Sequence, residues 1–191
     1  MRKALLRSIS VLVIIGLSLI SGFVFSKICE KLEYKEYPMD FAESVSKYSE
    51  KYGVPEIIIY SIIKTESDFK SNAVSSVGAV GLMQIMPSTC EWISARLGET
   101  NEFALMYDPD TNIRYGTYLI SFLKLRYGNW DTVFAAYNAG HGRVDQWLEN
   151  EEYSSGNGVL HTIPLKETRG YVEKVNNARA VYKRLYPELD K

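Results

Sequence analysis

Glu66 is the residue of this sequence best placed to act as a catalytic acid. It follows a nearly unbroken apolar run, residues 57–63, and precedes Ser67. On a helix Ile62 and Ile63 lie one turn before Glu66, so its carboxyl shares the face that they turn toward a core. Apolar burial and the negative end of the helix dipole both raise the pKa of a carboxyl. We therefore expect Glu66 to stay protonated near neutral pH, as a general acid must.

Several helical segments, ended by glycine or proline, must position this acid. Apolar residues recur at helical spacing over residues 41–52, and Pro55 opens the segment that carries Glu66. Ser88 and Glu91 have the spacing of a capping box at the start of the next helix. The later helices are predicted from Pro87-Ser88 to residue 97 and at residues 108–127, 130–138 and 167–186.

The fold class indicated by these patterns is mostly α. No segment shows the sustained alternation of apolar and polar residues that is typical of a strand. Residues 67–86 contain Gly78 and Gly81 and read as a structured loop, with room for one short β-hairpin. The sequence therefore predicts six to eight short helices around a cleft.

The N-terminus has the pattern of a membrane anchor. Three basic residues precede an apolar stretch over residues 8–25. A helix of that length reaches about 27 Å, close to the thickness of the hydrocarbon core. Basic residues before a span place the N-terminus in the cytoplasm. We expect a cytoplasmic basic region at 1–7, a single-pass transmembrane signal anchor at 8–25, a juxtamembrane linker at 26–38 and an extracytoplasmic domain at 39–191.

Cleavage of this segment is the alternative. Ser18, Ser21 and Gly22 are small enough for a signal peptide, but no small-x-small pattern follows the apolar stretch. We favour the uncleaved anchor, which holds the domain at the cell membrane.

Composition excludes several classes of function. The net charge is −1, and the three basic residues of the first seven positions leave −4 for the remainder, so we expect no nucleic acid partner. Cys29 and Cys90 are poorly placed to pair, and with two histidines and no cysteine cluster there is no pattern for a metal site. The 14 tyrosines suit either a helical core or a sugar-binding groove.

Four motifs together resemble one known family. They are Glu66-Ser67, the loop GAVGLMQIMP at 78–87, AYNAG at 136–140 and ETRGYV at 167–172. Their order and spacing resemble the soluble lytic transglycosylase family over roughly residues 45–185. The resemblance implies a lysozyme-like, goose-type-related helical domain with a substrate cleft, and it makes residues 39–191 a catalytic domain without metal or organic cofactor.

The resemblance also implies roles for individual residues. Glu66 matches the single catalytic acid/base of the family. The other matches are substrate-binding residues: Ser75 near an acetamido group, Met83 and Gln84 in the groove, Tyr137 and Asn138 in the cleft motif, and Tyr171 facing the catalytic carboxyl.

The implied reaction is non-hydrolytic cleavage of peptidoglycan. Glu66 would protonate the oxygen between N-acetylmuramic acid and N-acetylglucosamine, and the C6 hydroxyl would close onto C1 to leave a 1,6-anhydro end. Peptidoglycan strands and the membrane are then the expected partners, and no motif names a partner in a cell-envelope machinery. Two alternatives stay open: a hydrolytic muramidase that uses Asp68 as second carboxylate, and a non-catalytic glycan-binding scaffold.

Overall fold

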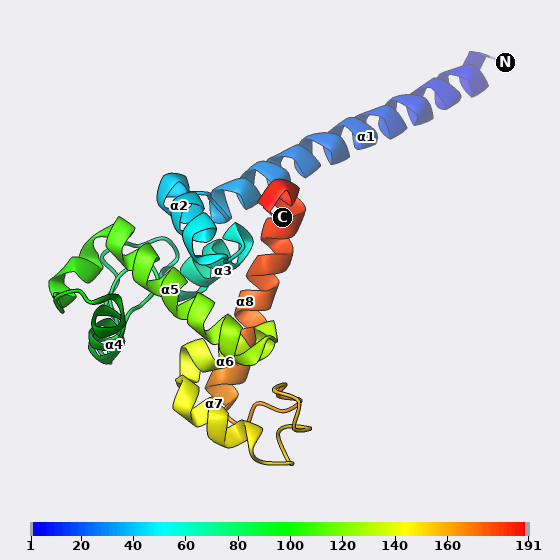
Figure 1. Cartoon of the computed structure of the whole chain (residues 1–191). Helices are drawn as coiled ribbons and strands as arrows, with labels where there is room; N and C mark the ends of the chain where they lie inside the picture. The colour runs from blue at the N-terminus through cyan, green and yellow to red at the C-terminus, as the bar shows by residue number, and fades with distance from the viewer. Residues whose placement is uncertain (1, 190–191) are drawn as a thin grey trace. The chain divides into compact units, whose positions relative to one another are not determined.

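The computed structural model describes the backbone of residues 2–189 and the side chains of residues 15–189. The chain divides into two compact units, Met1–Pro38 and Met39–Lys191. The first unit contains one continuous helix, α1 (Arg2–Glu36), drawn in blue in Figure 1. Within the described part of the chain, no helix has the length and apolarity needed to cross a membrane. The side chains of the predicted basic region 1–7, and of residues 8–14 of the predicted anchor, lie outside that part.

The second unit is built from helices, as predicted. Its elements, in chain order, are α2 (Ala42–Tyr52), α3 (Glu56–Ser67), α4 (Pro87–Leu97), η1 (Phe103–Tyr107), α5 (Pro109–Tyr127), α6 (Trp130–Ala139), α7 (His141–Leu148), α8 (Lys166–Leu185) and η2 (Pro187–Leu189). The η elements are short 3-10 helices of five and three residues. The mostly α fold class is therefore confirmed for the described residues.

The core forms around α3. Every residue of the apolar run Ile57–Ile63 is buried, which explains why this segment is apolar on all sides. α3 packs along α8, where Tyr60 stacks on Tyr182 with ring centroids 5.6 Å apart. α2 packs on α5, and α6 contacts both α5 and α8 (Figure 1). Helix α3 is thus held in the interior of the unit, and its last turn carries Glu66.

Two details of the helix boundaries differ from the prediction. The capping box at Ser88 is wrong, because α4 starts at Pro87 with Met86 at the N-cap and no side-chain cap. The predicted start of the helix at Pro87-Ser88 is confirmed, with proline at the first helical position, where its missing N–H is tolerated. No helix was predicted for residues 141–148, where α7 starts directly after the glycine that ends α6 and buries Val144 and Trp147.

The loop between α3 and α4 contains no β-strand. Its described residues form isolated antiparallel bridges, Val74 with Val80 and Val80 with Ile85, so the hairpin for which we saw room is reduced to these bridges. The loop starts with Asp68 and Phe69 in the left-handed conformation, and Gln84 has a φ of 49°. Non-glycine residues adopt such angles only where surrounding contacts hold them.

Candidate active site

Glu66 combines a catalytic residue type with a perturbed pKa. It lies in the last turn of α3, after the buried isoleucines, and only part of the residue is exposed. Burial raises the pKa of its carboxyl from 4.5 to about 7, and a contact with Tyr171 offsets part of that rise. At neutral pH both the protonated and the ionised forms are therefore populated. Such a group can give and take a proton in the same reaction cycle.

Two tyrosines from other helices lie next to this carboxyl. Tyr171 comes from α8 and Tyr137 from α6. Burial raises the pKa of both phenols, and the charge of Glu66 raises both further. The Tyr171 hydroxyl lowers the pKa of the Glu66 carboxyl, yet it is buried and forms no hydrogen bond of ordinary geometry with any described residue. It is thus available as a donor when the carboxyl ionises.

Tyr137 also connects α6 to the GLMQIMP loop. Its hydroxyl donates a hydrogen bond of 2.7 Å to the backbone carbonyl of Met83. The Met83 side chain is fully buried, where it contacts Gly116 of α5 so closely that a Cβ on Gly116 would overlap the Met83 sulfur. Met83 therefore contributes its main chain to the site and its side chain to the core. Its predicted contact with substrate stays a prediction.

Asn112 of α5 also holds the GLMQIMP loop in place, through hydrogen bonds of its side chain. The residue is fully buried, and its Oδ1 accepts the Met83 N–H at 2.7 Å. Its Nδ2 donates to the carbonyls of Val80 at 2.9 Å and Met106 at 2.8 Å. One amide thus satisfies three buried backbone groups that would otherwise cost about 1–3 kcal/mol each. The sequence analysis missed this residue, because nothing in the pattern of the helix distinguishes it from a solvent-facing asparagine.

Comparison with known proteins identifies this arrangement. Residues 43–158, from α2 to the loop after α7, match the family model "Transglycosylase SLT domain". The chain belongs to this family. The resemblance seen in the four sequence motifs is thereby confirmed.

Solved structures and curated relatives agree with the family. The 70 kDa soluble lytic transglycosylase of Escherichia coli superposes with a TM-score of 0.72 at 32% identity, over 80% of this chain and 25% of that one. An inactive glutamate-to-glutamine mutant of Slt from Pseudomonas aeruginosa gives 0.69 at 35% identity, over 78% and 24%.

A membrane-bound protein is also among the relatives. The soluble lytic murein transglycosylase of E. coli K12 is 34% identical over 86% of this chain and 26% of its own length. Membrane-bound lytic murein transglycosylase C of Edwardsiella ictaluri is 32% identical over 76% of this chain and 47% of its own length. The chain thus spans about a quarter of the soluble relative and about half of the membrane-bound one.

Ser75 and Gln84 form hydrogen bonds within the loop between α3 and α4. The Ser75 hydroxyl accepts the Ala79 N–H at 2.9 Å, within a turn that contains Gly78. The Gln84 side-chain amide donates to the carbonyls of Gly81 at 2.9 Å and Ala73 at 3.2 Å. These bonds give both residues a role in the shape of the loop. Their contacts with sugar stay predictions.

Asn138, in the AYNAG motif, connects α6 to α8 through a hydrogen bond. Its Oδ1 accepts a hydrogen bond of 2.8 Å from the hydroxyl of Thr168, which is buried. Thr168 lies one turn before Tyr171 on α8, so this bond fixes the helix that presents the tyrosine to Glu66. Asn138 itself is exposed, which leaves its side-chain amide accessible to a ligand.

Asp68 lacks the environment of a second catalytic carboxyl. Its side chain is 55% exposed and forms ion pairs with Lys64 at 2.6 Å and Lys70 at 3.5 Å. The hydrogen bond from Lys64 holds the pKa of Asp68 below its usual value. In the part of the chain that the structure describes, the pKa of Glu66 responds to burial and to Tyr171 and to no other carboxyl.

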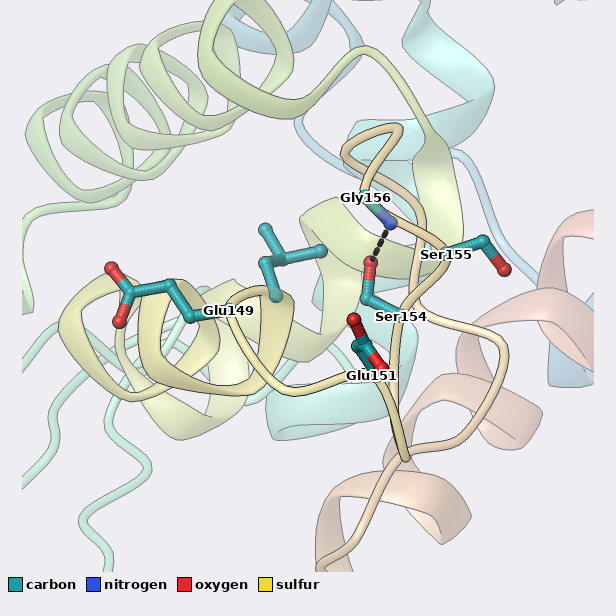
Figure 2. Close-up of a pocket in the computed structure, with 6 residues that line it drawn as sticks. Glu149, Glu151, Ser154, Ser155 and Gly156 are labelled. Carbon is teal, nitrogen blue, oxygen red and sulfur yellow. Dashed lines mark hydrogen bonds between the residues drawn. The ribbon is translucent and has the colours of Figure 1, made fainter.

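Across the described residues, no group of three or more histidine, cysteine, aspartate or glutamate side chains could hold a metal ion. Glu149 and Glu151 line a hollow of about 470 Å³ between the end of α7 and the loop that follows. Figure 2 shows this hollow, with the hydrogen bond from the Gly156 N–H to the Ser154 hydroxyl at 3.2 Å. None of the predicted site residues lines it.

Proposed function

We propose that this protein is a peptidoglycan lytic transglycosylase that cleaves the bond between N-acetylmuramic acid and N-acetylglucosamine without adding water. The observation that carries the proposal is Glu66, a carboxyl with a pKa of about 7 flanked by two buried tyrosine hydroxyls. Membership of the SLT family supports the choice of substrate. The inactive glutamate-to-glutamine mutant of the P. aeruginosa relative supports a glutamate as the essential group.

The first half of the reaction needs an acid. Protonated Glu66 donates its proton to the glycosidic oxygen, the bond from that oxygen to C1 breaks, and the N-acetylglucosamine side leaves as an alcohol. Positive charge develops at C1. The acetamido oxygen of the same muramic acid residue stabilises it, as in substrate-assisted glycosidases, so no second carboxylate is required.

The second half needs a base at the same place. Ionised Glu66 takes the proton of the C6 hydroxyl as its oxygen bonds to C1, which closes the 1,6-anhydro ring. The attack is intramolecular and benefits from a high effective concentration. Glu66 returns to its protonated form, and no water is consumed.

The neighbouring tyrosines make this exchange of roles feasible. Between the two halves Glu66 is ionised in a poorly solvated site, which is costly unless a donor compensates. The Tyr171 hydroxyl is adjacent and has no other partner among the described residues. It can donate to the carboxylate during that interval. Tyr137 meanwhile holds the loop at Met83 against α6 through its hydrogen bond to the Met83 carbonyl.

The same proposal places the protein in the cell envelope. Peptidoglycan lies outside the cytoplasmic membrane, and a membrane-bound lytic transglycosylase is among the relatives. We propose that residues 8–25 anchor the chain, with residues 39–191 on the cell-wall side, as the basic residues before this segment favour.

Digestion of cell-wall sacculi tests the function. The purified full chain, kept in detergent, is incubated with sacculi, and the soluble muropeptides are analysed by mass spectrometry. The proposal predicts products lighter by one water than the reducing muropeptides that a muramidase releases, and no products from Glu66→Gln. Reducing ends as the main product would overturn it.

A further inference from the structure

A hollow of about 300 Å³ lies where two of the family motifs end. It is lined by Ser88, Thr89, Trp92, Leu119, Gly140 and His141. We call it the Trp92 hollow. Ser88 directly follows the GLMQIMP motif, and Gly140 is the last residue of the AYNAG motif. Both walls are therefore continuations of the segments that hold Met83 and Tyr137 at the site of Glu66.

The aromatic wall of this hollow is held rigidly. The guanidinium of Arg96 lies over the Trp92 ring, 4.4 Å from its centroid. Phe122 meets the same ring edge-on at 4.8 Å, and the His141 ring lies 6.0 Å away. Trp92 nevertheless stays partly exposed where it lines the hollow. A fixed, partly exposed indole loses little conformational entropy when a ligand packs against it.

The polar groups around the indole suit a neutral ligand. The hydroxyl-bearing residues Ser88 and Thr89 line the hollow, and the His141 ring adds a further donor or acceptor. No carboxylate lines the hollow, which argues against a cation as its ligand. An aromatic surface with a few well-placed hydrogen-bonding groups is typical of a site for a small organic ligand.

We infer that the Trp92 hollow is a subsite for an N-acetylated hexopyranose ring of the glycan strand, distinct from the ring whose bond is cleaved. A pyranose has an apolar face of C–H groups, which fits the indole, and an edge of hydroxyls, which fits Ser88, Thr89 and His141. This inference rests on the proposed function for the identity of the strand. Its consequence is a dependence on length: strands long enough to reach the hollow bind more tightly than short ones.

Binding of chitin oligomers to the inactive full chain tests the subsite. Chitohexaose and chitobiose are titrated into the Glu66→Gln chain by calorimetry, alone and combined with Trp92→Ala or His141→Ala. We expect each added substitution to weaken chitohexaose binding by about five- to tenfold, as loss of an aromatic or hydrogen-bonding contact does. Chitobiose, which is too short to occupy both regions, should bind no better to the parent than to the variants.

Matched variants control for unfolding. Trp130→Ala and His161→Ala change the same residue types outside the hollow and should leave chitohexaose binding unchanged. If Trp92→Ala lowers the melting temperature, the chitohexaose affinities of His141→Ala and Thr89→Val are compared with the parent instead. Unchanged chitohexaose affinity in the folded variants, or no binding of chitohexaose to the parent, would overturn the subsite.

The test separates this inference from the proposed function. Wild-type chain that releases anhydro muropeptides while the variants keep their chitohexaose affinity would refute the subsite alone. Wild-type chain that cleaves no sacculi, while Trp92→Ala still weakens chitohexaose binding, would refute the transglycosylase and leave a sugar-binding hollow.

Discussion

The hydroxyl of Tyr137 donates a hydrogen bond of 2.7 Å to the main-chain carbonyl of Met83. The two residues are 54 positions apart and belong to different motifs. Because the Tyr137 hydroxyl also lies near Glu66, this one bond sets the position of the loop relative to the acid. The amide of Asn112 holds the same peptide from the other side, through the Met83 N–H.

Tyr137→Phe should lower activity more than stability. The substitution keeps the ring and removes one hydrogen bond, which costs about 1 kcal/mol of stability. A loop displaced even slightly from the acid costs more in catalysis, and we expect a loss of about tenfold in the rate of sacculus digestion. Tyr107→Phe, on an exposed ring, is the control. An unchanged rate in Tyr137→Phe would contradict a positioning role.

Gly81→Ala should destabilise the protein much more than Gly78→Ala. Both glycines have positive φ, 82° and 88°, so alanine strains the backbone at each. Only at Gly81 would the new Cβ overlap the Asn112 amide and come within 2.5 Å of the Met106 carbonyl oxygen. Denaturant unfolding should show a loss of about 1 kcal/mol for Gly78→Ala and about 3 kcal/mol or more for Gly81→Ala. Equal losses would show that the loop can move away from Asn112.

The sequence predicted correctly those features of the fold and the site that depend on residues close together in the chain. The apolar run before Glu66 predicted both a buried helix and a raised pKa, and both are found. Glycines at helix ends predicted the boundaries of α2, α4 and α5. These features depend on residues within one or two turns of each other, which a pattern can show.

The hydrogen bonds that fix the loop and the helices around Glu66 could not be predicted from the sequence pattern. Asn112 contacts a loop about 30 residues away, and its burial depends on the packing of α5. The role of Thr168 depends on where α6 ends. Likewise Ser75 and Gln84 were expected to contact sugar, and only the structure of the loop shows the hydrogen bonds that they form within it. The partners of Asn112 and Thr168 are distant in sequence. Those of Ser75 and Gln84 are near in sequence, but they lie in an irregular loop whose conformation no periodic pattern predicts.

Glu66→Gln should change how stability depends on pH. The folded-state pKa of Glu66, about 7, lies above its ordinary value of 4.5, so the folded chain retains a proton that the unfolded chain loses. Wild-type stability should therefore fall, relative to Glu66→Gln, as the pH rises from about 4.5 to about 7. The shift corresponds to about 3 kcal/mol at most. Denaturant unfolding of both chains at several pH values measures it, and parallel curves would show that Glu66 is not desolvated.

Asp68→Asn should leave activity nearly intact. The side chain is exposed and paired with Lys64 and Lys70, and such surface ion pairs contribute about 1 kcal/mol or less. We expect less than about a twofold change in the rate of sacculus digestion, with a comparably small change in melting temperature. Loss of activity in a folded Asp68→Asn chain would instead favour the hydrolytic muramidase, in which this carboxyl activates water.

Digestion of sacculi in water enriched in heavy oxygen tests most directly the claim that Glu66 works without water. The new bond to C1 comes from the C6 hydroxyl in our account, so mass spectrometry of muropeptides made by the wild-type chain should show 1,6-anhydro ends without the label. Heavy oxygen at C1 of the newly formed ends would mean that water is the nucleophile, and would contradict the account.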